Sequence, residues 1–210
     1  MAITISFGSI RSLVDRLRET PRKRPMSKIS SVCVFCGSSN NVAANYLDCA
    51  SEFGRLCAEA GITVVFGGGR VGLMGALADA AMDAGGKVLG VIPKFLDEVE
   101  IAHHGTTEII ITDDMHERKA TMAAHADAFV VLPGSIGTLE ETFEVMTWKQ
   151  LGRFDKPIIL ANIDGYWQPI IDLLDHMTGE EFLRPEHRDL VSVVDNIEAI
   201  LPALGIRSAS

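Results

Sequence analysis

The stretch VVLPGSIGTLEETFEVMTW, from Val130 to Trp148, passes from one kind of secondary structure to another within a few residues. It opens with an apolar run that is typical of a buried strand, and Pro133 ends that strand because proline cannot donate to a sheet. Two glycines follow, and a helical pattern that carries three glutamates begins directly after them. A strand that leads through a glycine turn into a helix is the repeating unit of a parallel sheet with helices packed on it.

The same alternation of strand and helix continues along most of the chain. Short apolar runs rich in β-branched residues predict strands at 31–36, 62–66, 87–92, 107–112, 128–132, 157–161 and 190–194. Helical patterns lie between them, at about 44–60, 72–85, 114–126, 138–151, 167–177 and 195–204. We therefore predict an α/β fold, a doubly wound and mostly parallel sheet flanked by helices, in which ligands bind at the carboxyl ends of the strands.

Length and composition predict one domain with its own core, because the chain has 210 residues and a hydrophobic content of 47%. We expect the domain to span residues 31–206 and the Arg-rich residues 1–30 to form a flexible tail, with a targeting peptide as the alternative interpretation. No apolar run reaches the ~18 residues that a membrane-spanning helix needs, and the first residues lack a secretory signal. We therefore expect a soluble, cytoplasmic protein with no membrane partner.

Charge is distributed unevenly along the chain. The first 30 residues hold seven of the 19 Lys and Arg residues but only two of the 28 Asp and Glu residues, so the predicted domain is more acidic than the net charge of −9 indicates. An acidic domain argues against nucleic acid as the main partner, because a phosphate backbone needs a basic surface. A single anionic nucleotide in a local pocket remains compatible with this charge.

Cysteine and histidine residues give no sign of a metal or redox site. Cys33 and Cys36 form a C-x-x-C pair, but they lie inside an apolar run, and no second pair completes a zinc site. We interpret the four cysteines as reduced thiols and this pair as structural residues of a strand. His103 and His104 are adjacent in a polar loop with no carboxylate at metal-ligand spacing. We therefore expect neither a metal nor a cofactor.

Three loops at predicted strand ends carry unusual residues, and they read CGSSNN at 36–41, FGGGRVGLMG at 66–75 and PGSIGT at 133–138. They follow the first, second and fifth predicted strands. Because the carboxyl ends of parallel strands share one edge of a sheet, we expect the three loops to lie together there.

The second loop contains G-x-G-x-x-G as Gly67, Gly69 and Gly72, in the strand-to-helix context of a dinucleotide fingerprint. The acidic residue that NAD requires at the end of the next strand is missing, because Pro93 and Lys94 stand there. This disfavours a dinucleotide, whereas backbone amides that meet a phosphate or a ribose, or a tight turn with no ligand, remain open.

The third loop allows two interpretations. Gly134 and Gly137 permit close approach of a ligand to the backbone, and Thr138 and the amides that follow it are suited to bind an anion. Alternatively, Thr138 and Glu141 form a capping box, in which the threonine caps the helix and the glutamate reaches back to its amide. The residues of the loop by themselves leave both interpretations open.

Upstream of this loop, the stretch DDMHERKATMAAH at 113–125 predicts a helix capped by Asp114. One face of that helix carries four side chains at positions i, i+3, i+4 and i+7, namely Met115, Arg118, Lys119 and Met122. Cations on a face that packs against the core need an anionic partner, because an unpaired buried charge is too costly. The partner is either a structural carboxylate or a substrate phosphate together with Glu141, and the remaining alternative is a snorkelling arginine.

Five segments in the same order and spacing resemble the LOG (lonely guy) family, and these are CVFCGSSNN, VVFGGGRVGLMG, GVIPKFL, MHERKATM and LPGSIGTLEETFEVMTWKQLG. The resemblance runs from about Ser31 to Leu204. Members of this family are cytokinin riboside 5'-monophosphate phosphoribohydrolases that were long labelled lysine decarboxylases. This chain departs from the family pattern at Ser135, where a glycine is usual, and at Asn41.

The resemblance implies a Rossmann-like fold, a homodimer with the site near the interface, and hydrolysis of the N-glycosidic bond between an adenine-type base and ribose 5-phosphate. It makes Arg118 and Glu141 the catalytic residues. We expect the nucleoside monophosphate to bind eleven further residues, which are Gly37, Ser38, Gly67, Gly68, Gly69, Met115, Lys119, Gly134, Ser135, Gly137 and Thr138.

The chemistry of such a cleavage assigns a role to each charge. The sugar passes through an oxocarbenium-like state, which a carboxylate stabilises, and the same carboxylate positions or activates water. We expect Glu141 to act in this way and Arg118 to hold it ionised and to orient the phosphate or the sugar.

A module of the same fold that binds a nucleotide without cleaving it is the alternative. Decarboxylation would require a lysine in a Schiff-base context, which the sequence does not offer, and the base preference is not set by the sequence.

Overall fold

The computed structural model describes residues 29–97 and 102–206. Its seven strands form one parallel sheet in the order β4-β3-β2-β1-β5-β6-β7, which confirms the predicted doubly wound fold. The strands are β1 (Ser31–Phe35), β2 (Thr63–Phe66), β3 (Val88–Pro93), β4 (Glu108–Thr112), β5 (Ala128–Val131), β6 (Ile158–Ala161) and β7 (Ser192–Val194). The predicted tail lies outside the described residues except for its last two positions, of which Ile29 is buried.

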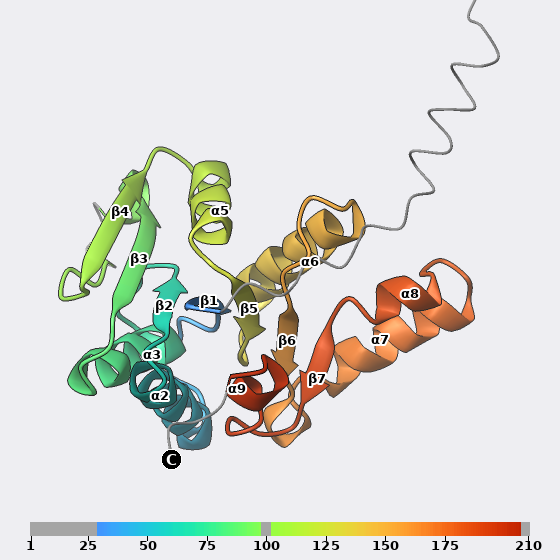
Figure 1. Ribbon diagram of the computed structural model, residues 1–210, viewed down its shortest axis with the longest axis horizontal. Helices are drawn as coiled ribbons and strands as arrows, with labels where there is room; N and C mark the ends of the chain where they lie inside the picture. The colour runs from blue at the N-terminus through green and yellow to red at the C-terminus, as the bar shows by residue number, and fades with distance from the viewer. Residues whose placement is uncertain (1–28, 98–101, 207–210) are drawn as a thin grey trace, which may run out of the picture.

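The helices lie between the strands (Figure 1). They are α2 (Ala44–Glu59), α3 (Gly72–Asp83), α4 (Lys94–Asp97), α5 (Met115–Ala124), α6 (Ile136–Gln150), the 3-10 helix η1 (Ile163–Gly165), α7 (Gln168–Gly179), α8 (Pro185–Arg188) and α9 (Ile200–Ala203). Five of the six predicted helices are confirmed. The three elements that the sequence did not predict, α4, η1 and α8, are too short to show a helical period.

The sixth predicted helix, at 195–204, is wrong over its first half, because only Ile200–Ala203 is helical. The side chain of Asn196 accepts a hydrogen bond from the amide of Ala199 at 2.9 Å. Such a local bond stabilises a turn in place of a helix.

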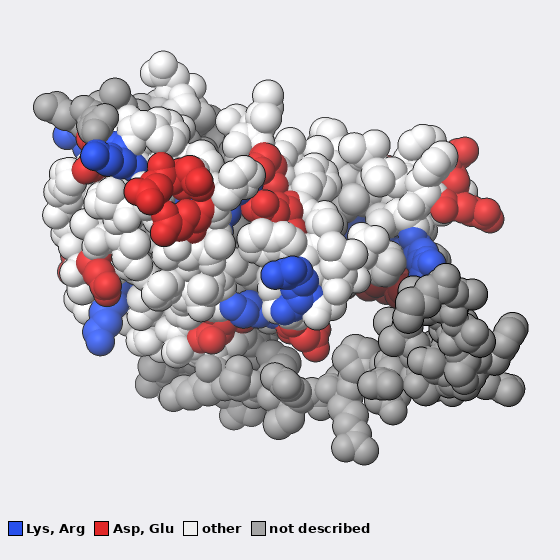
Figure 2. All heavy atoms as spheres, turned by 90° about the horizontal axis from the view of Figure 1, so that it is seen from above, with Lys and Arg blue, Asp and Glu red and all other residues white. Residues whose placement is uncertain are grey.

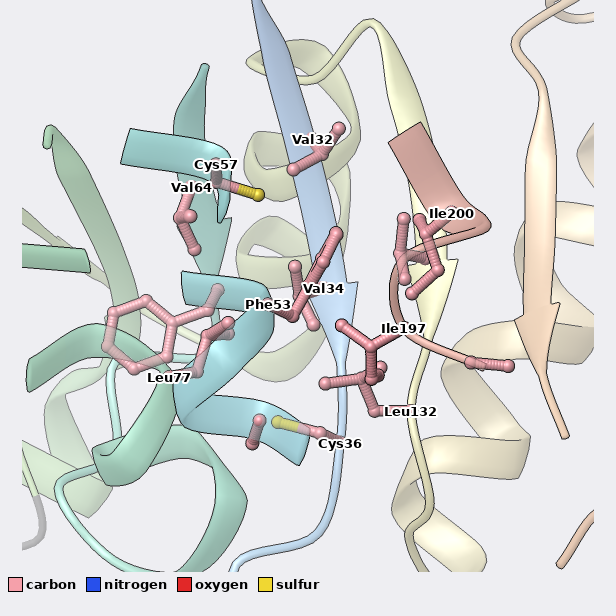
Figure 3. Close-up of a cluster of buried hydrophobic side chains, with 14 of the residues drawn as sticks. Val32, Val34, Cys36, Phe53, Cys57, Val64, Leu77, Leu132, Ile197 and Ile200 are labelled. Atoms are coloured by element: carbon pink, nitrogen blue, oxygen red, sulfur yellow. The ribbon is translucent and has the colours of Figure 1, made fainter. Parts of the chain in front are cut away.

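The central strands are buried on both faces because helices cover both sides of the sheet. Val32 and Val34 of β1 pack with α2, α3 and α9 in the cluster that Figure 3 shows, and α2 and α3 lie side by side (Figure 1). The alternate residues Cys33 and Phe35 face a second cluster with α5, α6 and α7. Cys36 belongs to the first cluster, so the two cysteines of the C-x-x-C pair lie on opposite faces, and both are free thiols.

The strand order reverses between β1 and β5, and the loops that follow these two strands therefore leave toward opposite faces of the sheet. The three predicted loops meet at this point. The amide of Gly37 donates to the carbonyl of Pro133, and the amide of Leu73 donates to the carbonyl of Gly37, each at 3.0 Å. The prediction that the loops share one edge of the sheet is confirmed.

Charged side chains on the surface are dispersed. On the face that Figure 2 shows, Asp and Glu side chains form several groups, and Lys and Arg side chains lie beside and between them. In the part of the chain that the structure describes, no helix has the length and apolar character needed to cross a membrane.

Candidate functional site

The start of α6 contradicts the interpretation in which Thr138 caps this helix. The helix begins at Ile136, and Ser135 is its N-cap residue with φ −107° and ψ −155°. Thr138 therefore lies inside the first turn, where its side chain is buried, and the predicted capping box with Glu141 is wrong. A Cβ atom at position 134 would lie 2.1 Å from the Thr138 hydroxyl, so only glycine fits beside this threonine.

The first amides of α6 are open to a ligand. Within the described residues, no side chain caps this helix end, and the first intrahelical bond at this end joins the amide of Leu139 to the carbonyl of Ser135 at 3.0 Å. The amides before Leu139 have no acceptor in the helix itself, as at every helix start. A Cβ atom at Gly137 would meet no protein atom within 4 Å, which leaves space here. Open amides and the helix dipole together favour an anion.

Helix α5 presents the predicted stripe of apolar and cationic side chains. Asp114 caps the helix as predicted, because its carboxylate accepts a hydrogen bond from the amide of Glu117 at 2.8 Å. Arg118 and Lys119 are each 8% exposed, and Met122 is buried beside them. The alternative of a snorkelling arginine is therefore wrong.

Arg118 is held by three acceptors from three different parts of the fold. Its Nη1 donates to Glu141 Oε1 at 3.0 Å, its Nε to the carbonyl of Val91 at 3.1 Å, and its Nη2 to the carbonyl of Gly67 at 3.1 Å. A Cβ atom at position 67 would lie 1.9 Å from Nη2, so the first glycine of the G-x-G-x-x-G loop makes room for the guanidinium. The partner of the buried arginine is thus a carboxylate of α6.

Glu141 is 9% exposed, and Arg118 binds only one of its two oxygens. Among the described residues, no donor bonds its Oε2. Burial raises the pKa of Glu141 above its usual value, and although the positive charge of Arg118 opposes this effect, the nearby Glu140 reinforces it. The site therefore holds a carboxylate with one oxygen fixed and the other available.

Lys119 makes a second connection between α5 and α6. Its Nζ lies 2.5 Å from Glu140 Oε1 and 3.1 Å from Glu144 Oε2. Burial would lower the pKa of Lys119, but the two glutamates outweigh this effect and raise it. In this structure, the ammonium group bonds to carboxylates of the protein, and the expected contact of Lys119 with substrate remains a prediction.

A cavity of about 160 Å³ lies at the point where the strand order reverses. Four of the expected substrate-binding residues line it, namely Gly37, Ser38, Gly134 and Ser135. Two other expected residues lie beside Arg118, because the carbonyl of Gly67 accepts from Nη2 at 3.1 Å and Met115 Sδ lies 4.0 Å from Nη1. The turn from Gly134 to Thr138 joins these two groups.

Six residues that line this cavity were not among the expected site residues. They are Ser39, Leu73 and Pro133, which belong to the three predicted loops, and Val42, Tyr46 and Tyr166, which lie outside them. Tyr46 and Leu73 carried no functional signal of their own because they match the ordinary apolar pattern of α2 and α3. Val42 is a single apolar residue just before α2, which gives no signal either. Tyr166 follows the sixth strand, in a loop with no glycine-rich or charged motif of the kind that drew attention to the other three loops.

Other parts of the structure do not add to this site. A larger cavity, of about 570 Å³, lies at the opposite edge of the sheet, where residues such as Ser31, Thr63 and Lys87 begin or precede strands, and it contains none of the expected site residues. His103 Nε2 lies 2.8 Å from Asp79 Oδ1. Over residues 29–97 and 102–206, no group of three or more His, Cys, Asp or Glu side chains is arranged to hold a metal ion.

Comparison with known proteins identifies relatives of this chain. The family model described as "Possible lysine decarboxylase" matches residues 74–204. The cytokinin riboside 5'-monophosphate phosphoribohydrolase of Rhodococcoides fascians is 46% identical over 182 residues, which cover 86% of this chain and 91% of that protein. An Arabidopsis thaliana protein of the same name is 44% identical over 165 residues, which cover 79% of this chain and 77% of that protein.

Solved structures share the fold at lower identity. The molybdenum cofactor carrier protein of Chlamydomonas reinhardtii superposes with a TM-score of 0.63 at 24% identity and covers 83% of this chain and 95% of its own. The molybdenum cofactor binding protein of Rippkaea orientalis has a TM-score of 0.63 at 20% identity, and the match covers 86% of this chain and 98% of that protein. These likenesses show a common Rossmann-like fold. The family model and the close relatives together show that this chain belongs to the LOG (lonely guy) family.

Proposed function

We propose that this protein hydrolyses the N-glycosidic bond of a purine riboside 5'-monophosphate, of the cytokinin or adenine type, and releases the free base and ribose 5-phosphate. Residues 31–206 act as one catalytic domain. The observation that carries the proposal is the buried pair of Arg118 and Glu141, one helical turn behind the open start of α6. Relatives at 44–46% identity that are named for this activity support it.

Glu141 is placed to act on the sugar. Bond cleavage develops positive charge on the ribose, and a carboxylate in a dry site stabilises such charge more strongly than one in water. Arg118 fixes Oε1 of Glu141, which leaves Oε2 to face the sugar or the attacking water. Arg118 is itself fixed by two backbone carbonyls, so the carboxylate needs no rearrangement during the reaction.

The start of α6 supplies the phosphate site. The open amides and the positive end of the helix dipole favour a phosphate. One helical turn rises about 5.4 Å, which is comparable to the span from a 5'-phosphate to the anomeric carbon of the ribose, so a phosphate at Gly137 and Thr138 leaves the attached sugar within reach of Glu141. This arrangement accounts for a glycine turn that precedes glutamates. The phosphate binds at the turn, and Glu141 acts one turn later.

Ser135 does not argue for the alternative of a nucleotide-binding module. Its φ of −107° lies in the extended region that any residue adopts, so a serine in place of the usual glycine introduces no backbone strain. Its exposed side chain lines the cavity and makes no capping hydrogen bond to the first amides of α6.

The proposal is tested by incubating the protein with AMP and with isopentenyladenosine monophosphate, in parallel with the two nucleosides, and separating base from nucleotide by chromatography. We expect base release from the monophosphates but not from the nucleosides. Glu141→Gln should lower kcat by about 10³-fold or more, because it removes the charge that the sugar needs. Glu186→Gln, an exposed glutamate on α8, is the matched control and should keep full activity.

The outcome also separates the two candidate functions. No base release by the folded wild-type protein would contradict the hydrolase, and nucleotide binding without product would favour the binding module. Activity of Glu141→Gln near that of the wild type would contradict the role of this carboxylate. The ratio of rates with the two monophosphates sets the base preference.

The protein is further proposed to form a homodimer in the cytoplasm. Helix α6 supports the dimer, because Ile136, Phe143 and Leu151 are exposed and lie on one side of it, with Ile136 83% and Leu151 69% exposed. Large apolar side chains that share one exposed face are typical of a contact with another protein surface. The cytoplasmic location stays a prediction that cell fractionation tests.

A further inference from the structure

Tyr166 lies in the connection between β6 and α7 and reaches across to the turn before α6. Its hydroxyl donates a hydrogen bond to the carbonyl of Gly134 at 2.6 Å. Its ring lies edge-on to that of Tyr46 of α2, with centroids 5.5 Å apart, and to that of the buried Trp167, with centroids 4.8 Å apart. The phenol is thus supported from two sides, and it lines the cavity between the first and third loops.

The loop that carries Tyr166 is held in place by its own hydrogen bonds. The side chain of Asn162 accepts from the amide of Trp167 at 2.8 Å and donates to Gln168 at 3.3 Å. Asp164 accepts from the Asn45 side chain of α2 at 2.6 Å. The hydroxyl of Tyr166 therefore approaches Gly134 from an ordered loop.

The bond to the carbonyl of Gly134 also sets the direction of an amide. A peptide unit is planar and trans, so the carbonyl of Gly134 and the amide of Ser135 point in opposite directions. With the carbonyl held by Tyr166, the Ser135 amide points away from the tyrosine. The peptide between Pro133 and Gly134 is also held through its carbonyl, which accepts a hydrogen bond from the amide of Gly37 at 3.0 Å. Among the described residues, neither the Gly134 amide nor the Ser135 amide has a protein acceptor.

A glycine needs such a restraint more than other residues. Gly134 has no side chain to limit its dihedral angles, so the peptide that follows it is free to rotate unless a partner holds it. Rotation would turn a carbonyl oxygen, in place of an amide, toward the start of α6. A carbonyl there would repel an anion that the other amides attract.

We propose that Tyr166 is a positioning residue for the phosphate site. Its hydroxyl holds the peptide between Gly134 and Ser135 so that the Ser135 amide joins the first amides of α6 around the phosphate of the nucleotide. Tyr166 acts through Gly134 and does not touch the reacting atoms. This inference rests on the proposed function only for the identity of the nucleotide, because the site it describes binds a phosphate whether or not the base is cleaved.

The test compares Tyr166→Phe with the wild type by calorimetry, with ribose 5-phosphate and adenosine as ligands, and by steady-state kinetics with AMP. The variant keeps the ring and loses one neutral hydrogen bond, so we expect about fivefold weaker binding of ribose 5-phosphate. The KM for AMP should rise by a similar factor with kcat little changed, and the affinity for adenosine should stay the same. The pH dependence of kcat should not change, because Glu141 is untouched.

Thr178→Val is the matched control. It also removes a hydroxyl that donates to a backbone carbonyl, that of Leu174 at 2.8 Å, but it lies at the other end of α7. It should leave both affinities unchanged, whether or not it lowers the melting temperature of the protein.

Three results would overturn the inference. They are unchanged binding of ribose 5-phosphate by Tyr166→Phe, an equal loss for adenosine, and no binding of ribose 5-phosphate by the wild type. If the wild type binds ribose 5-phosphate but releases no base, the hydrolase proposal fails alone, and the comparison of the two affinities still decides the role of Tyr166.

Discussion

At the scale of single residues, the site depends on a charge that is costly to bury. Glu141 is almost fully enclosed, and one arginine compensates for its charge through one oxygen. Removal of either partner leaves the other buried without a counter-charge, which typically destabilises a protein by about 3–5 kcal/mol. A role in catalysis explains the presence of this buried pair better than a contribution to stability does.

The pH dependence of activity follows from this burial. Because burial raises the pKa of Glu141, activity should fall with decreasing pH at values above the usual Glu pKa of about 4.3. A profile of log(kcat/KM) against pH checks this expectation. An acid limb centred at or below the usual value would contradict it.

The same shift has a definite sign for stability. A group whose pKa is raised by folding stabilises the protein at low pH, and this contribution is lost as pH rises through the folded-state value. Glutamine does not titrate, so the melting temperature of Glu141→Gln relative to the wild type should increase from acidic to neutral pH. A difference that stays constant over this range would mean that burial does not raise the pKa of Glu141.

At the scale of elements, α5 and α6 are joined by two adjacent cationic residues of one helix and three glutamates of the other. Arg118 pairs with Glu141 inside the protein, and Lys119 pairs with Glu140 and Glu144 nearer the surface. The Lys119 charge also lowers the pKa of Glu141, while Glu140 and Glu144 raise it. The charges of the Lys119 pairs therefore affect the pKa of Glu141.

Lys119→Met should show this coupling, because it keeps much of the apolar stem and removes the charge. We expect the acid limb of the activity profile to move to higher pH and the free energy of unfolding to fall by about 1–2 kcal/mol, since Glu140 is half exposed and its pair is partly screened. Lys119→Arg keeps the charge and should retain the wild-type acid limb. Equal profiles for Lys119→Met and the wild type would mean that Lys119 does not influence Glu141.

At the scale of the whole molecule, the exposed apolar side of α6 predicts association of two copies of the chain. We expect light scattering after size-exclusion chromatography to give the mass of a dimer. Phe143→Asp should shift the protein toward monomer, because it places a charge among Ile136 and Leu151. Leu173→Asp replaces an exposed leucine of α7 away from this side and should remain dimeric. A monomeric wild-type protein, or equal effects of the two variants, would contradict this interface.

Local patterns in the sequence predicted the strands, most of the helices, the parallel sheet and the edge of the sheet where the three loops meet. These features follow from local patterns, because a strand buried on both faces must be apolar throughout and a loop between a strand and a helix shows its glycines directly. The cap at Asp114 was predictable for the same reason, since its partner Glu117 is three residues away.

The assembly of the site depends on contacts between elements that are distant in the sequence. The bond between Arg118 and Glu141 joins residues 23 positions apart, and its length depends on how α5 and α6 pack against the sheet. The start of α6 at Ile136 excludes the capping box of Thr138 and Glu141, which the local residues fit as well as they fit an anion-binding turn. Tyr166 reaches Gly134 from 32 positions away, from a loop that carried no motif. Such contacts are set by packing between distant elements, which no local pattern of residues records.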